Sequence, residues 1–434
     1  MRRISKLAAR LTSGGKELVS RIGQRLPWHT TVDTLEGRNT RNLYAETTWF
    51  GIVNGLAATF VSVFALRMGA TTAQVGWLAA LPALVNIVWL IPAARIIERQ
   101  RRRLPLILWS GLLQRLGYIF MALMPLLIAA GRVEALIVIN TLITLPAAVI
   151  NTAITSLIPD LTSPERRGDV VSVRWLILAV AATGAALLGG WFLDLVPVPL
   201  NYQLLLGTGA VLSLISLRYL RRIRVPDTVL YGRETRPRER YSWQRLRTSL
   251  ASVRSHRQFL RFSLASFIFY WGLYLPGALW SVFRVRDLGA SDGWIGLIAV
   301  IVDGSTIAGY FLWAKISAKR GNRWVLVVTA LGVTVYSLLT AVVPTIGWMI
   351  PTSLLGGFAW AGCNLAMFNV MLGVCPPERR PTYIAMYTAL MNVTAFAGPL
   401  LGAALSGWIG IRPAFVVSSA VRGLGVLLFL ALVR

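Results

Sequence analysis

The sequence predicts an all-α polytopic membrane protein whose twelve transmembrane helices form two pseudo-symmetric six-helix halves. Three observations support this fold class: the composition, the spacing of the apolar runs and an internal repeat. Hydrophobic residues make up 56% of the 434 residues and charged residues only 14%, whereas soluble domains are about 25% charged. A chain of this composition is expected to have the lipid bilayer as one of its solvents.

The apolar runs are each long enough for a membrane-spanning helix, which needs roughly 20 predominantly apolar residues. Runs bounded by charge clusters predict six spans in the first part of the chain, at 43–66, 73–94, 104–129, 135–158, 171–195 and 202–217. Six more follow, at 262–283, 294–313, 324–343, 349–374, 383–410 and 414–433. The spans divide the chain into a basic cytoplasmic arm (1–41), an N-terminal half (42–218), a basic cytoplasmic linker (219–261) and a C-terminal half (262–434).

The basic residues indicate the orientation of the chain and argue against a nucleic-acid partner. Of the 44 Lys and Arg residues, 37 fall on the side that holds the N-terminus, five on the opposite side and two inside spans. Positive loops mark the cytoplasmic side, so we expect a multi-pass protein of the cell (inner) membrane with both termini cytoplasmic. The net charge of +27 is spread over alternate loops instead of one surface, which disfavours nucleic-acid binding.

The reactive side chains argue against an enzyme and against a bound metal. Cys363 and Cys375 share one apolar run, whereas His29 and His256 lie in polar segments, so these residues do not form a His/Cys metal cluster. No span carries a Ser/His/Asp, His/Cys or paired-carboxylate cluster, the usual signs of a catalytic site. We therefore expect no catalytic activity, no metal and no cofactor, and any proton chemistry inside the membrane must use carboxylates.

An internal repeat relates the two halves. The segment LRMGA at 66–70 recurs as RDLGA at 286–290, and PERR at 164–167 recurs at 377–380. The offsets are 220 and 213 residues, so two similar six-span halves follow one another along the chain. In transporters built from parallel repeats, such halves rock around a site at the membrane midplane.

The loops after the second and eighth spans carry two partial copies of a family signature. With them the chain resembles the major facilitator superfamily, whose twelve-helix form has the loop signature Gly-x-x-x-Asp-Arg-x-Gly-Arg-Arg. The acid and the basic run survive in the first copy, and the second glycine survives in the second copy. The resemblance implies a cytoplasmic gate formed by Glu98, Arg99, Arg102, Arg103, Lys319, Gly321 and Arg323.

The resemblance also implies that the first, fourth, seventh and tenth helices line a central cavity. In this chain those helices carry aromatic and amide side chains, which suit a small amphipathic organic solute better than an ion. Interface belts and core packing use the same aromatic residues, and this alternative stays open for each of them singly. The candidate substrate residues are Trp49, Asn54, Asn140, Asn151, Tyr270, Trp271, Tyr274, Trp360, Asn364 and Asn369.

Charged residues inside spans cost about 2.5–3.5 kcal/mol each on insertion scales, so each one suggests a function. Glu46 and Arg174 lie at similar depths near the cytoplasmic ends of their helices, where they can pair or extend to the headgroups. Arg115 lies deeper, so a direct pair with Glu46 is disfavoured and contacts to helix carbonyl groups are expected instead.

Asp303 is the first candidate for a proton-coupling residue. It lies roughly 14 Å along its helix, near the centre of a core about 30 Å thick, and Arg422 lies at a similar depth. The two residues form either a pair that opens and closes during the transport cycle or a fixed pair that holds helices together. Glu46 and Arg174 are the other coupling candidates.

These observations predict a secondary active transporter that uses alternating access, with proton-coupled export of small amphipathic organic solutes as the leading interpretation. A proton-coupled uptake symporter is the alternative within this class, and a non-transporting receptor or assembly factor on the same fold is another. The expected partners are a small-molecule substrate, protons and the lipid bilayer, and the chain is expected to be monomeric.

Overall fold

The computed structural model describes residues 34–100, 103–225, 256–376 and 380–433. The regular structure within these ranges is helical, and twelve helices are long and apolar enough to cross a membrane. This finding confirms the predicted fold class. The expected arm up to residue 33 and most of the expected linker, 226–255, lie outside the described residues.

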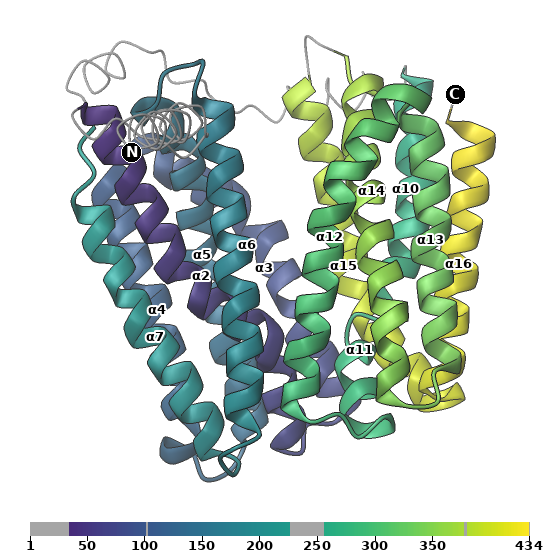
Figure 1. Ribbon diagram of the computed structural model, residues 1–434, viewed down its shortest axis with the longest axis horizontal. Coiled ribbons are helices and arrows are strands. Elements are labelled where there is room, and N and C mark those ends of the chain that lie inside the picture. The colour runs from purple at the N-terminus through teal and green to yellow at the C-terminus, as the bar shows by residue number, and fades with distance from the viewer. Residues whose placement is uncertain (1–33, 101–102, 226–255, 377–379, 434) are drawn as a thin grey trace, which may run out of the picture.

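Six long helices form the N-terminal half: α2 (Leu35–Arg67), α3 (Thr72–Arg99), α4 (Arg103–Leu127), α5 (Arg132–Leu161), α6 (Arg167–Leu193) and α7 (Leu200–Arg221). The seventh span is interrupted and consists of α10 (Arg257–Tyr274), α11 (Leu279–Val282) and the π-helical turn η1 (Phe283–Asp287). The remaining elements are α12 (Asp292–Arg320), α13 (Asn322–Val342), the 3₁₀ turn η2 (Ile346–Trp348), α14 (Met349–Val374), α15 (Arg380–Ile409) and α16 (Ile411–Leu432). Helix α2 begins and α16 ends at the same face of the molecule, at the top of Figure 1.

Polar caps and a duplicated glycine turn set the ends of several helices. Thr71 and Gln74 form a capping box at the start of α3, and Ser291 caps the start of α12, as expected for such residues. Two positions before these caps lie Gly69 and Gly289, with φ of +92° and +62°, a conformation that glycine adopts without steric cost. The repeated segments LRMGA and RDLGA therefore encode the same helix-ending turn in both halves.

The two halves stand side by side, with α6 and α12 at their boundary (Figure 1). Small residues allow the close approach of α6 to its neighbours. A Cβ added at Gly55 of α2 would lie 2.3 Å from the Ala182 carbonyl oxygen, and one at Gly296 of α12 would lie 2.5 Å from the Ala186 carbonyl oxygen. Helix α6 is therefore in backbone contact with its own half through α2 and with the other half through α12.

Candidate functional site

A large cavity lies between the two halves. Its volume is about 1140 Å³, and its walls come from α2 and α6 of the N-terminal half and from α10 to α14 and α16 of the C-terminal half. A mostly apolar lining with a few polar groups is the usual character of a site for a small organic molecule. The aromatic lining residues are Trp175, Trp280, Tyr310, Phe311, Tyr336 and Trp360.

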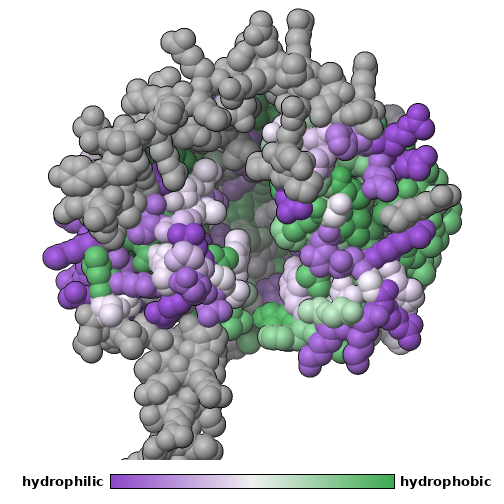
Figure 2. Space-filling model, turned by 90° about the horizontal axis from the view of Figure 1, so that it is seen from above, coloured by the Kyte–Doolittle hydropathy of each residue, from purple (hydrophilic) through white to green (hydrophobic). Residues whose placement is uncertain are grey.

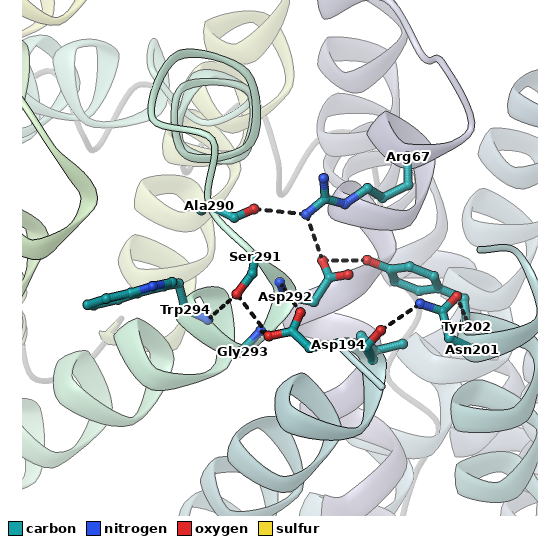
Figure 3. A network of polar contacts seen from close by, with 10 residues as sticks. Arg67, Asp194, Asn201, Tyr202, Ala290, Ser291, Asp292, Gly293 and Trp294 are labelled. Carbon is teal, nitrogen blue, oxygen red and sulfur yellow. Dashed lines mark hydrogen bonds and ion pairs between the residues drawn. The ribbon is translucent and has the colours of Figure 1, made fainter. Parts of the chain in front are cut away.

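Hydrogen bonds between the halves close one end of the molecule (Figure 3). We call this network the latch; it comprises Arg67, Asp194, Tyr202, Ser291 and Asp292. Asp194 accepts hydrogen bonds from the Ser291 hydroxyl at 2.8 Å and from the Asp292 amide at 2.9 Å, so an acid at the end of α6 caps the start of α12. The Asp292 carboxylate accepts from the Tyr202 hydroxyl at 2.7 Å and from Arg67 at 3.4 Å. The latch therefore ties the halves together at the ends of α2 and α6.

The opposite face, where α2 begins and α16 ends, is open. Arg103 pairs with Asp160 of its own half at 3.6 Å, and Arg323 donates to the Leu430 carbonyl of its own half at 2.8 Å. Between described residues, no side-chain hydrogen bond joins the halves at this face. Figure 2 shows the same face hollowed between the two halves. The cavity is thus accessible from the face that carries both described chain ends.

Those expected gate residues that the structure describes lie at this open face. Gly321 ends α12 with a φ of +83°, and Lys319 is exposed in the last turn of that helix. Glu98 and Arg99 belong to the last turn of α3, but their side chains, and all of Arg102, lie outside the described residues. Their role in a cytoplasmic gate stays a prediction.

Asp303 lies in the cavity wall, near the middle of α12. Its carboxylate accepts a hydrogen bond at 2.8 Å from the hydroxyl of Thr183 on α6. This bond joins the two halves at mid-depth, well away from the latch. The surroundings of Asp303 therefore change if the halves move apart, and Asp303 lines the cavity whereas the latch acids do not.

Arg422 also lines the cavity, but its partners are backbone carbonyl groups. It donates to Gly272 at 3.1 Å, to Val333 at 2.9 Å and to Leu273 at 3.5 Å, and only 1% of it is exposed. The Gly272 carbonyl is available because the helical donor four residues later would be Pro276, which has no amide hydrogen. In this conformation of the described residues, Arg422 therefore forms no ion pair with Asp303, in contrast to the expected fixed pair. A pair that opens and closes during the transport cycle stays a prediction.

Three of the ten expected substrate residues, Asn54, Trp360 and Asn364, line the cavity. Of the others, Asn140 donates to the Leu78 carbonyl and Asn369 to Asn322 within their own halves. The remaining five described side chains, also absent from the lining, are Trp49, Asn151, Tyr270, Trp271 and Tyr274. The expectation that the fourth helix lines this cavity is wrong for the described residues of α5, because α6 packs against both α2 and α12 and takes that place.

A second group of buried charges lies in the N-terminal half. Arg115 forms an ion pair with Glu46 at 3.7 Å, and each side chain is only 1% exposed. Arg174 donates to the Thr47 hydroxyl at 3.1 Å, and this hydroxyl lies 3.2 Å from the other Glu46 oxygen. The expectation that Arg115 lies too deep for Glu46 is wrong. Glu46 lies 11 residues after Leu35 and Arg115 12 residues after Arg103, where α2 and α4 begin, so their depths match.

The sequence analysis did not identify two residues of the site, the Asp303 partner Thr183 and the lining residue Arg284. Thr183 looked like one of many small polar residues in an apolar helix, and its bond to Asp303 depends on how the halves meet. Arg284 was counted with the loop after the seventh span, but it lies in η1 and lines the cavity. The spacing of Trp280 and Arg284 could have indicated this position. The two residues are four apart, which places two side chains on one helix face.

Known proteins resemble this chain in sequence. A family model described as the Major Facilitator Superfamily matches residues 48–261 and again 262–434. The "Efflux pump aflT" of Aspergillus parasiticus is 26% identical over 151 residues, which cover 35% of this chain and 28% of that protein. The "Multidrug resistance protein MdtG" of Serratia proteamaculans is 27% identical over 172 residues, covering 36% of this chain and 40% of that protein. Each match thus spans less than half of the relative.

The fold is also shared with solved structures. The crystal structure of a D-xylose-proton symporter superposes with a TM-score of 0.70 over 92% of this chain and 98% of that chain, at 14% identity. Such a likeness shows the fold alone, but the family model covers both halves. The chain therefore belongs to the Major Facilitator Superfamily, whose members with this fold are membrane transporters and not enzymes.

Proposed function

We propose that this protein is a secondary active transporter that exports small amphipathic organic solutes in exchange for protons by alternating access. The observation that carries the proposal is the inter-half cavity, which is closed by the latch at one end and open at the other. Asp303 in its wall is bonded to Thr183 of the other half. Rocking of the halves would break the latch, open the cavity to the other side and change the surroundings of the Asp303 carboxyl.

The aromatic and amide lining supports an amphipathic organic solute as the substrate. Export is supported by the names of the two relatives, an efflux pump and a multidrug resistance protein. Proton-coupled uptake is the second candidate, and the fold shared with a D-xylose-proton symporter favours it. A receptor or assembly factor on the same fold would bind solute in the cavity without moving it.

The proposal includes an orientation. Described basic residues of the side that holds the N-terminus, among them Arg103, Lys319 and Arg323, lie at the open face, and basic loops mark the cytoplasm. The structure would then be inward-open, with the latch at the outer face of the cell membrane and the protein acting as a monomer. The expected gate residues, among them Glu98 and Arg103, would close the cytoplasmic face in the opposite state.

Purified protein in liposomes tests the proposed function. A panel of aromatic organic solutes is offered with and without an imposed pH gradient, and accumulation is measured in both directions. We expect at least one solute to be concentrated only when the gradient is present, in the direction opposite to proton flow. Concentration in the same direction as the protons would establish uptake symport, and binding without transport would favour the receptor.

Replacing Asp194 by alanine is expected to weaken the latch and to shift the protein away from the inward-open state. The variant loses the acid that accepts from Ser291 and Asp292, and the loss of a helix cap costs about 0.5–2 kcal/mol. One to two kcal/mol changes an equilibrium about 5- to 30-fold. The opening is measured by labelling a cysteine introduced at Ala70, a position that is buried at the latch face. Both native cysteines are replaced by alanine in this background.

Labelling from outside intact cells with a membrane-impermeant thiol reagent should accelerate about 5- to 30-fold in the Asp194→Ala variant. The matched control is Glu134→Ala, because Glu134 lies near the same face but binds Gln74 of its own half. Equal labelling rates in the two variants would show that Asp194 does not hold the outer face shut.

A further inference from the structure

Arg284 places a positive charge in the cavity. The residue belongs to the π turn η1 at the latch end of the seventh span, and it lines the cavity together with Trp280 and Ser281. In the π turn the Leu288 amide donates to the Phe283 carbonyl at 3.0 Å, a wider turn than that of an α-helix. Such π-helical turns occur frequently at functional sites.

The guanidinium of Arg284 is held in position by aromatic rings. Its central carbon lies 5.8 Å from the centroid of the Trp280 ring, within reach of a cation–π interaction. Trp280 in turn stacks on Tyr336, with 4.9 Å between centroids and 6° between planes, and packs against Phe415 at 4.7 Å. The Trp280 ring therefore lies against one face of the guanidinium, while the hydrogen-bond donors lie in the guanidinium plane.

The charged side chains that line the cavity differ in whether they have hydrogen-bond partners. Three lining residues carry a charge: Asp303, Arg284 and Arg422. Arg422 donates to three carbonyl groups and Asp303 accepts from Thr183. The Arg284 Nε, by contrast, is buried without a hydrogen-bond partner, and no described carboxylate lies within ion-pair distance of the side chain.

Arg284 is half-buried, and the cost of removing part of a cation from water falls when an anion pairs with it in good geometry. The planar guanidinium suits a carboxylate or another flat or tetrahedral oxyanion, which it can bind with two hydrogen bonds. Ser281 precedes Arg284 by three residues and adds a hydroxyl to the same wall. The apolar wall of α12, with Ile295, Ile298 and Val302, offers space for an apolar body.

We propose that Arg284 is a binding residue for the anionic group of the transported solute, and that the substrates are amphipathic organic anions with an aromatic or aliphatic body. This inference rests on the proposed transport function and names its substrate class. The bound anion would lie close to the latch, because the Arg284 carbonyl accepts from the Ala290 amide at 2.8 Å and the Ala290 carbonyl accepts from Arg67 at 2.8 Å.

Three probes of one shape and different charge test the proposal: 1-naphthylacetate, neutral 1-naphthylacetamide and cationic 1-naphthylmethylamine. Binding to the purified full-length protein in lipid nanodiscs is measured by calorimetry at neutral pH. We expect the wild type to prefer naphthylacetate. In Arg284→Gln the affinity for naphthylacetate should fall about 10- to 100-fold, as for the loss of a charge-assisted hydrogen bond, whereas the affinity for the amide should change less than about threefold.

Arg132→Gln is the matched control, since it removes an exposed arginine outside the cavity and should leave all three affinities unchanged. Arg284→Lys should retain part of the preference for the anion, and melting temperatures confirm that each variant is folded. Equal affinities for the three probes, a preference for the amine, or no binding of naphthylacetate would overturn the proposal. Selective binding without transport in liposomes would instead leave the anion site standing and contradict the transport function.

Discussion

Replacing Asp303 by asparagine is expected to abolish pH-driven accumulation of solute while solute exchange persists. The substitution removes the proton-binding carboxyl but keeps an oxygen that can accept the hydrogen bond from Thr183, now 2.8 Å long. The cavity shape and the mid-depth contact between the halves should therefore be retained. In liposomes, accumulation under a pH gradient should fall to the level without a gradient, while counterflow with solute on both sides should continue at a similar rate.

Thr183→Val separates the carboxyl from its hydrogen bond. This variant keeps Asp303 and removes only the hydroxyl that binds it, so pH-driven accumulation should continue, at a changed rate. The Asp303 assignment fails if the asparagine variant still concentrates solute against a gradient. It also fails if exchange and accumulation are lost together in a protein that is folded and binds solute, because the residue would then serve transport of either kind.

The number and order of the helices were predictable because a bilayer of fixed thickness demands an apolar run of fixed length. The residue at which α2 begins was not predictable in this way. Residues 35–42 are polar, yet Thr34 caps a helix that includes them, its hydroxyl accepting from the Gly37 amide at 3.1 Å. Hydropathy marks the part of a helix inside lipid, whereas caps mark where the helix begins. This difference of eight residues led to the wrong depth for Glu46.

The partners of the buried charges depend on tertiary contacts that composition and spacing do not contain. Pro276 is plain in the sequence, but only the packing of α16 against α10 brings Arg422 to the carbonyl that this proline leaves without a donor. Arg284 was assigned to a loop because the seventh span contains a break and a π turn, neither of which changes the hydropathy of the run. The charged residues inside the apolar runs were thus found from the sequence with the exception of Arg284, whereas the pairing of Arg115 with Glu46 was not.

Replacing Glu46 by glutamine is expected to give the largest loss of stability among single substitutions in the N-terminal half. Arg115 would keep its charge, its bond to Ser216 at 2.8 Å and its contact with the Phe50 ring at 4.8 Å, but would lose its only described carboxylate. Removing one partner of a buried ion pair costs roughly 3–5 kcal/mol. For a chain of 434 residues, the melting temperature of purified protein in detergent should then fall by roughly 3–6 °C.

Glu36→Gln is the matched control on the same helix. Glu36 lies 4.0 Å from Arg166, and both side chains are about one-third exposed, at 28% and 33%. Partly exposed pairs contribute about 1 kcal/mol or less, so this variant should melt within about 1 °C of the wild type. The contrast between the two glutamine variants isolates burial as the cause, because the chemical change is the same.

A double variant tests whether the cost comes from the charge left behind. With Glu46→Leu and Arg115→Met, both charges are replaced by apolar groups of similar length, a change that is often neutral or stabilising for a buried pair. Much of the lost melting temperature should then return. If Glu46→Gln instead melts like the wild type and loses pH-driven accumulation, the buried pair is not structural. Glu46, with Arg174 linked to it through Thr47, would then replace Asp303 as the proton-coupling residue, because accumulation driven by the pH gradient would require the Glu46 carboxyl.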